Sequence, residues 1–178
     1  MKHLKRLDHI VVGVSGSSSA HEVSEFIDLL QQHIAHQVTV LCTPSAVKFV
    51  SQTGISYLTD EDWVDMPTHT LLAAQADEFI IAPATTNTLA KCALGIADNL
   101  VTTTFLAFTG AAFFVPGTNG AMWNAAITQR HVAELRSRGH HVLNPGPAVA
   151  ASTGILGDAV GRGWRSAVAE IIECRSLY

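Results

Sequence analysis

The stretch Phe79–Leu100, with the sequence FIIAPATTNTLAKCALGIADNL, decides the fold that this chain is expected to adopt. Its first four residues, Phe79 to Ala82, are apolar, which is typical of a strand buried on both faces of a sheet. After Pro83 comes a polar turn made of Thr85, Thr86, Asn87 and Thr88. A helical pattern then begins at Leu89. An ordinary helix cap needs one such polar residue, so four in a row favour a site for a phosphate or another polar ligand.

Polar turns follow two other expected strands. Asp8–Val14 runs into a Gly/Ser turn, Ser15–Ser19, and Ala111–Val115 runs into a Pro/Gly turn, Pro116–Asn119. The alternation of strands, turns and helices predicts right-handed crossovers and a parallel sheet. Because the carboxyl ends of parallel strands share one edge, we expect the three turns to converge on one ligand site.

The Gly/Ser turn is a weak fingerprint for a dinucleotide. Its third glycine is missing, and the second expected strand, Val38–Leu41, does not end in an acidic residue that could hold a ribose. Cys42, Thr43 and Pro44 occupy that place instead. A mononucleotide such as FMN therefore fits the pattern better than NAD does.

Another helical pattern begins at Thr68 and leads into the central strand. We expect Thr68 to cap this helix, which would put His69 in its first turn. The positive end of a helix disfavours the imidazolium form, so His69 would remain available as a base or a hydrogen-bond partner. A plain structural role for His69 is the alternative.

Length and composition predict one domain, residues 1–178, with a full core. The chain is 48% hydrophobic and 15% charged, with a mean hydropathy of +0.26, so part of its apolar surface is expected in subunit contacts. A net charge of −4 without Lys/Arg clusters argues against nucleic acid as a partner. We expect a cytoplasmic protein, because no apolar run is long enough to cross a bilayer. Three widely spaced cysteines without a CxxC pair indicate neither disulfides nor a metal site.

The segment Asn144–Gly163 is rich in Gly, Pro and Ala and has weak periodicity. It is expected to be either a disordered loop or a lid that orders over a ligand. The preceding His141–Leu143 is expected to be the final strand, and Trp164–Cys174 the closing helix.

Several short motifs occur together in this order: Ser15-Gly16-Ser17, His69 eight residues before Asp77, Pro83-Ala84-Thr85-Thr86-Asn87-Thr88, Ala97-Asp98-Asn99-Leu100, and Pro116-x-x-Asn119-x-x-Met122-Trp123. With these motifs the chain resembles the homo-oligomeric flavin-containing cysteine decarboxylases over nearly its whole length. That family includes phosphopantothenoylcysteine decarboxylase and the enzymes that decarboxylate the C-terminal cysteine of lanthipeptide-type and linaridin-type precursor peptides. Each motif alone is weak, but their order and spacing make the resemblance specific.

The resemblance implies a three-layer flavodoxin-like (Rossmann-type) α/β fold with a parallel sheet, bound FMN, and trimers that can assemble into dodecamers. It implies His69 and Asn119 as the catalytic pair. It implies substrate contacts from Asn119, Met122 and a flap over Ala148–Gly163. The implied FMN contacts are Gly16, Ser17, Ser18, Thr43, Ser45, Thr85, Thr86, Asn87, Thr88 and Gly117.

Two departures from the family pattern bear on the substrate and on the flavin contacts. Phosphopantothenoylcysteine decarboxylases carry a flap cysteine that helps reduce the enethiol intermediate, whereas Ala148–Gly163 contains no cysteine. This absence favours decarboxylation of the C-terminal cysteine of a precursor peptide to an aminoenethiol, the precursor of an S-aminovinyl-cysteine ring, alongside other peptide-modifying enzymes. Gly117-Thr118 also replaces the family's Ala-Met before Asn119, which weakens the inference that Gly117 contacts the flavin ring.

Three other functions are alternatives. Phosphopantothenoylcysteine decarboxylase of coenzyme A biosynthesis would need a basic pocket for the substrate phosphate, and none can be assigned. A catalytically silent FMN-binding regulator would be expected to carry a long acidic tail, which this chain lacks. A flavin prenyltransferase is disfavoured by the motif around Asn119 and Met122.

Overall fold

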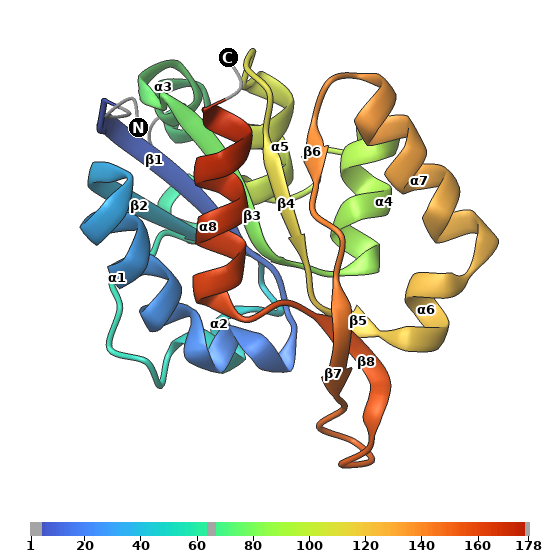
Figure 1. The fold of residues 1–178 in the computed structure, drawn as a ribbon. Coiled ribbons are helices and arrows are strands. Elements are labelled where there is room, and N and C mark those ends of the chain that lie inside the picture. The colour runs from blue at the N-terminus through green and yellow to red at the C-terminus, as the bar shows by residue number, and fades with distance from the viewer. Residues whose placement is uncertain (1–4, 64–66, 177–178) are drawn as a thin grey trace.

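A five-stranded parallel sheet forms the centre of the molecule (Figure 1). The computed structural model describes residues 5–63 and 67–176. The strand order is β2-β1-β3-β4-β6, so the chain changes direction across the sheet between β1 and β3. The strands are β1 Leu7–Val14, β2 Ala35–Cys42, β3 Glu78–Ala84, β4 Phe113–Pro116 and β6 His141–Val142. The expected α/β fold with a parallel sheet is confirmed.

Helices cover both faces of this sheet and complete three layers (Figure 1). One face carries a short 3₁₀-helix (η1, Ser18–Glu22), α1 (Val23–His33), α2 (Val47–Val50) and α8 (Trp164–Arg175). The other face carries α3 (Thr68–Gln75), α4 (Thr86–Leu94), α5 (Leu100–Ala107) and α7 (Ala126–Ser137). Among the helices that the structure describes, none is long and apolar enough to cross a membrane.

The central strand β3 explains why the chain shows an apolar run there. Ile80 and Ala82 pack with α1 and α8, whereas Phe79 and Ile81 pack with α4 and α5. All four side chains are fully buried. A strand covered on both faces needs no polar alternation, so it appears in the sequence as a continuous apolar run.

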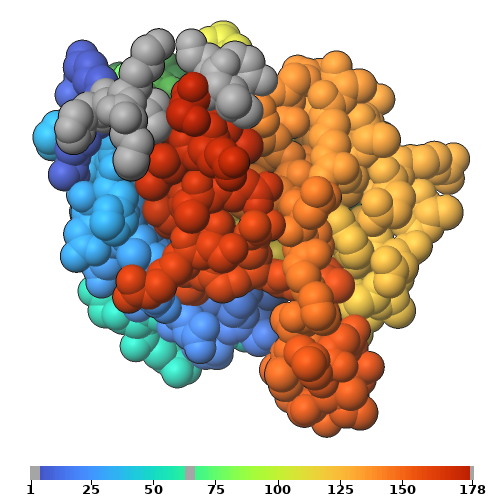
Figure 2. Space-filling model, viewed as in Figure 1, coloured from blue at the N-terminus to red at the C-terminus, as the bar shows by residue number. Residues whose placement is uncertain are grey.

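A second, antiparallel sheet of three short strands lies at the carboxyl edge of the first (Figure 1). Its outer part protrudes from the body of the molecule (Figure 2). Its strands are β5 (Thr118–Asn119), β7 (Gly146–Val149) and β8 (Leu156–Gly161), in the order β5-β8-β7. We call β7, β8 and the turn between them the hairpin. The alternative of a disordered loop was therefore wrong for this segment, and so was the expectation that residues 141–143 form the last strand. The hairpin is exposed on most of its surface, so its sequence carries no alternation that would predict strands.

The segment before β3 differs from one expectation. The N-cap of α3 is Pro67 and Thr68 is the first residue inside the helix, so the prediction that Thr68 caps it was wrong. His69 nevertheless lies in the first turn. The role of residues 55–63 was left open by the sequence. They include a 3₁₀-helix (η2, Asp60–Trp63), and the Asp60 carboxylate accepts a hydrogen bond from the Leu100 backbone N–H at 2.7 Å, at the start of α5.

Candidate functional site

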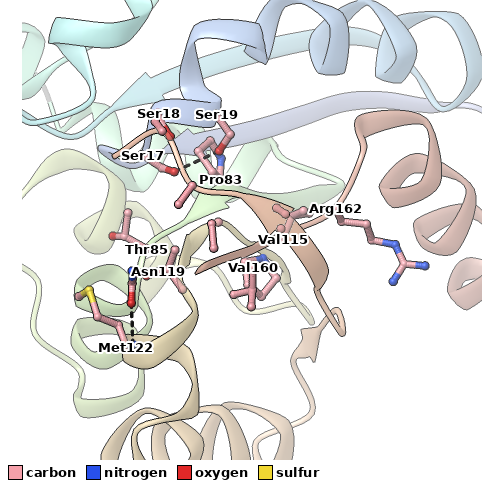
Figure 3. Close-up of a pocket in the computed structure, with 18 of the residues that line it drawn as sticks. Ser17, Ser18, Ser19, Pro83, Thr85, Val115, Asn119, Met122, Val160 and Arg162 are labelled. Carbon is pink, nitrogen blue, oxygen red and sulfur yellow. Dashed lines mark hydrogen bonds between the residues drawn. The ribbon is translucent and has the colours of Figure 1, made fainter. Parts of the chain in front are cut away.

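A cavity of about 710 Å³ lies between the carboxyl edge of the parallel sheet and the hairpin (Figure 3). The turns that follow four strands contribute to its wall: residues 16–19 after β1, Ser45 after β2, Thr85 to Asn87 after β3, and residues 116–119 at the end of β4 and beyond. The hairpin and Trp164 close another side. The three polar turns identified in the sequence therefore converge as predicted, at the edge where open α/β sheets bind ligands.

Ser15 ties the first two turns together. Its hydroxyl donates a hydrogen bond to the Pro83 carbonyl at 2.7 Å and accepts one from the Thr85 N–H at 2.9 Å. The side chain is buried, so both contacts are shielded from water. The sequence placed Ser15 in the Gly/Ser turn but did not predict that it bridges to the turn after β3. The available signal was a hydroxyl directly after an apolar strand, where a neighbouring strand end has backbone groups to satisfy.

Two glycines keep the wall of the cavity open. A Cβ at Gly16 would lie 2.5 Å from the Ser45 Oγ, closer than real contacts allow. A Cβ at Gly117 would lie 3.0 Å from both the Pro83 Cβ and the Ser19 Oγ. Backbone thus forms the wall at both places, as a cradle for a phosphate-bearing ligand requires. The cavity volume also falls in the range of small-molecule sites, so the residues present fit a mononucleotide such as FMN.

Most of the proposed FMN contacts line the cavity, and two lie behind it. The lining includes Gly16, Ser17, Ser18, Ser45, Thr85, Thr86, Asn87 and Gly117. Thr43 and Thr88 are buried outside the lining, and each supports a hydroxyl that belongs to it. The Thr43 Oγ1 lies 3.2 Å from the Ser45 Oγ, and the Thr88 Oγ1 lies 3.2 Å from the Thr85 Oγ1.

Asn119 stands in the cavity wall at the start of α6 (Gly120–Asn124) (Figure 3). Its Oδ1 accepts hydrogen bonds from the backbone N–H groups of Ala121 at 2.8 Å and Met122 at 3.4 Å. The carboxamide oxygen is thus engaged in capping the helix. The NH₂ group is the part available to a ligand, and it can donate to a carboxylate. Met122 lines the cavity beside it and is 52% exposed.

His69 lies outside the cavity that Asn119 and Met122 line. It belongs to the first turn of α3, and α3 packs against α5 on one face of the sheet. His69 is not among the described residues that line the cavity, so one chain does not bring it to Asn119 there. Two exposed leucines lie on these helices: Leu71 on α3 is 46% exposed and Leu106 on α5 is 57% exposed.

The charges around the cavity are few. Among the described lining residues, Glu22 and Arg162 are the charged ones. The Arg162 guanidinium forms an ion pair with Glu170 at 2.5 Å and donates to the Asn144 carbonyl at 2.8 Å. Arg162 is therefore already neutralised. The hairpin adds apolar surface, with Val149, Ile155 and Leu156 between 57% and 67% exposed.

Comparison with known proteins places this chain in a family. The family model described as Flavoprotein matches residues 1–175, and the chain belongs to that family. Two solved structures share its fold closely. A PPC decarboxylase mutant complexed with pantothenoylaminoethenethiol has 27% sequence identity and a TM-score of 0.87, covering 96% of this chain and 100% of the other. The FMN-dependent cysteine decarboxylase SpaF has 31% identity and a TM-score of 0.74, covering 92% and 94%.

The curated relatives include a phosphopantothenoylcysteine decarboxylase and a mersacidin decarboxylase. A probable phosphopantothenoylcysteine decarboxylase of Streptococcus mutans is 35% identical, over 80% of this chain and 85% of its own length. The mersacidin decarboxylase of Bacillus sp. (strain HIL-Y85/54728) is 31% identical, over 76% and 73%. The coenzyme A biosynthesis bifunctional protein CoaBC of Mycobacterium tuberculosis is 35% identical over 80% of this chain, which spans only 36% of that protein.

Proposed function

We propose that this chain is an FMN-dependent decarboxylase of the C-terminal cysteine of a precursor peptide, with an aminoenethiol as product. The observation that carries the proposal is the convergence, in one cavity, of a glycine- and hydroxyl-lined cradle, the Asn119 carboxamide and an apolar hairpin. The Flavoprotein family match and the FMN-dependent relative support FMN as the cofactor.

The chain's own residues have distinct tasks in this reaction. When bound, FMN would supply the oxidation of the cysteine Cα–Cβ–S unit, which creates the electron sink needed for loss of CO₂. The Asn119 NH₂ group would donate to the substrate carboxylate without forming an ion pair that opposes its departure. The residues around Gly16 and Thr85 would hold the phosphate and ribityl part of the cofactor.

His69 would accept the thiol proton or hold the sulfur, and it would come from a neighbouring subunit. Its absence from the lining of its own chain's cavity supports this arrangement. The exposed Leu71 and Leu106 on the packed helices α3 and α5 support it too, because large exposed apolar side chains are common in subunit contacts. A trimer, alone or assembled into a dodecamer, would supply such a neighbour.

Two observations favour a peptide over phosphopantothenoylcysteine. Arg162 is the cation of the described lining, and Glu170 already neutralises it, so it offers no free charge to a phosphate. The exposed apolar tip of the hairpin suits the last side chains of a peptide. The second candidate, phosphopantothenoylcysteine decarboxylation, is supported by the similarity to the complex with pantothenoylaminoethenethiol.

A direct assay separates the two functions. Purified, FMN-loaded protein is incubated with a short peptide that ends in cysteine and, separately, with phosphopantothenoylcysteine. Oxidative decarboxylation removes CO₂ and two hydrogens, so the peptide mass is expected to fall by about 46 Da. Reaction of the pantothenoyl substrate alone would contradict the peptide assignment and favour the second candidate. Protein that refuses FMN would contradict both.

A further inference from the structure

Two arginines, Arg162 between β8 and α8 and Arg136 on α7, meet at the root of the hairpin. Arg162, directly after β8, donates from Nη1 to the Asn144 main-chain oxygen at 2.8 Å and from Nε to the Ser166 hydroxyl at 3.1 Å. The same Nη1 lies 2.5 Å from an Oε2 of Glu170 in α8. Figure 3 shows the Arg162 side chain extending away from Ser17, Thr85 and Asn119. Its donors thus serve the hairpin root rather than a ligand.

Arg136 holds the same point from α7. Its Nη2 donates to the Asn144 Oδ1 at 2.8 Å and to the Val142 carbonyl at 2.7 Å. Asn144 therefore has its main-chain oxygen bound from the α8 side and its side-chain oxygen bound from the α7 side. Residue 144 lies two residues before β7 begins, and Arg162 directly follows the end of β8, so both strands of the hairpin are fixed at their base.

Beyond this root, the hairpin pairs with two residues of β5 and packs against the start of α6, where a Cβ at Gly120 would lie 2.9 Å from the Gly157 main-chain oxygen. Its tip is exposed. A two-stranded hairpin by itself is marginally stable in water. Charge-assisted hydrogen bonds at the root are the strong contacts in such a place. They restrict how far the hairpin can swing from the cavity that it lines.

We propose that Arg162 and Arg136 are positioning residues that clamp the hairpin root through Asn144 and so set the distance of the hairpin from the cavity. The clamp acts on substrate binding through the hairpin, and this kinetic consequence rests on the function proposed above. The effect of the clamp on the mobility of the hairpin does not depend on that function. Loss of either arginine frees the hairpin whether or not the reaction is the one proposed.

Limited proteolysis tests the clamp without any substrate. Thermolysin cuts on the amino side of large apolar residues, so the exposed Ile155 and Leu156 are its expected targets in FMN-loaded protein. Arg162→Gln and Arg136→Gln are expected to be nicked there at least about fivefold faster than wild type, because cleavage follows local opening. Arg165→Gln and Arg138→Gln are matched controls, since Arg165 of α8 and Arg138, directly after α7, are exposed and pair with Glu25 and Glu134 rather than with Asn144. Wild-type nicking rates in both clamp variants would overturn the proposal.

Asn144→Ala gives an independent variant, because Asn144 is exposed and its loss should leave the fold intact. It removes the Asn144 Oδ1 acceptor of Arg136 and keeps the main-chain acceptor of Arg162, so faster nicking of this variant supports the clamp even where Arg162→Gln does not fold. In turnover with the peptide, clamp variants are expected to raise KM by about tenfold and to change kcat less, since remote binding is weakened rather than the chemistry. A fall in kcat at unchanged KM would overturn the positioning role. Wild-type protein inactive on both substrates would defeat the proposed function, while the nicking result would still decide the clamp.

Discussion

The side chain of Asn119 divides its hydrogen-bonding groups between the fold and the cavity. Its oxygen caps α6 through the N–H groups of Ala121 and Met122, and its NH₂ group is left for a ligand. An aspartate can accept the same two hydrogen bonds and cap the helix equally well. It cannot donate, however, and it places a negative charge where a substrate carboxylate would bind.

Asn119→Asp is therefore expected to fold, to bind FMN and to lose at least about 10³-fold in kcat/KM, because an attractive donor becomes a repulsive charge. Circular dichroism and flavin absorbance would check the fold and the cofactor, and the peptide mass assay would measure turnover. Asn124→Asp, at the exposed end of the same helix, is the matched control and should keep wild-type rates. Normal turnover by Asn119→Asp would remove Asn119 from the reaction.

Gly16 offers a test of the cradle rather than of the chemistry. In Gly16→Ala the new Cβ would meet the Ser45 Oγ and Cβ at 2.5 and 2.7 Å, so one of the two turns must shift. We expect FMN to bind about tenfold more weakly or worse, the range typical of overpacked sites, as measured by flavin fluorescence titration. Gly146→Ala is the control, since a Cβ there would lie 3.9 Å from its nearest neighbour. Equal FMN affinities of the two variants would place the cofactor elsewhere.

Among whole elements, β3 and α8 are joined by a buried ion pair far from the cavity. The Glu78 Oε2, at the start of β3, lies 3.6 Å from the Nε of Arg175, at the end of α8, and both side chains are largely buried. Burial raises the pKa of Glu78 to about 7, although Arg175 lowers it and Asp77 raises it further. Desolvation thus outweighs the ion pair, as it often does for buried charges.

Because the pKa of Glu78 is higher in the folded state than its ordinary value of 4.5, the neutral carboxyl stabilises the fold at low pH. That contribution is lost as the pH rises from about 4.5 through about 7, and the loss amounts to at most about 3 kcal/mol. Glu78→Gln keeps the neutral shape and should lack this dependence. The midpoint of thermal unfolding of Glu78→Gln minus that of wild type is therefore expected to be larger at pH 8 than at pH 5.

The control for this comparison is Glu173→Gln, which changes an exposed glutamate of α8. Its unfolding midpoint should follow that of wild type at both pH values. If the difference between Glu78→Gln and wild type were the same at pH 5 and pH 8, the carboxyl of Glu78 would not titrate in this window.

The elements divide sharply into those that sequence reasoning can find and those that it cannot. β1, β3 and β4 are continuous apolar runs because helices cover both of their faces, so composition alone indicates them. The hairpin is exposed and lacks such a signal, and β5 is only two residues long. Its pairing with β8 links Asn119 to Ala159, forty residues away, and local patterns carry no information about such a partner.

The same limit applies to the candidate site. The turns after parallel strands could be assigned to one edge because topology alone brings them together. The bridging role of Ser15 within its turn could not be predicted, since it depends on the neighbouring Pro83 carbonyl. The sequence also could not predict that Ser45 lines the cavity while Thr43, two residues earlier, is buried behind its wall.

On the scale of the whole molecule, the separation of His69 from the cavity of its own chain makes a prediction about assembly. If each site takes His69 from one subunit and Asn119 from the next, then His69→Asn and Asn119→Asp chains should both be inactive alone. Co-expressed in equal amounts, they should recover about one quarter of wild-type activity in the unseparated mixture, the chance of a correct pair at a random interface, and about one third in mixed trimers, where one interface in three carries the correct pair. Tandem purification through two different tags isolates the mixed oligomers. Mixed oligomers without activity would place both residues in the same subunit's site.

The ladder between β5 and β8 has one more consequence. Thr118 and Asn119 pair with Val160 and Ala159, so the strand that returns from the tip of the hairpin also supports the backbone of the amide-bearing residue. If the hairpin moved outward to release product, these backbone hydrogen bonds would break and the position of Asn119 would no longer be fixed. Catalysis would then be possible only while the hairpin is closed over the cavity. With the hairpin open, the substrate thiol could bind, but the bond to its carboxylate would not be cleaved.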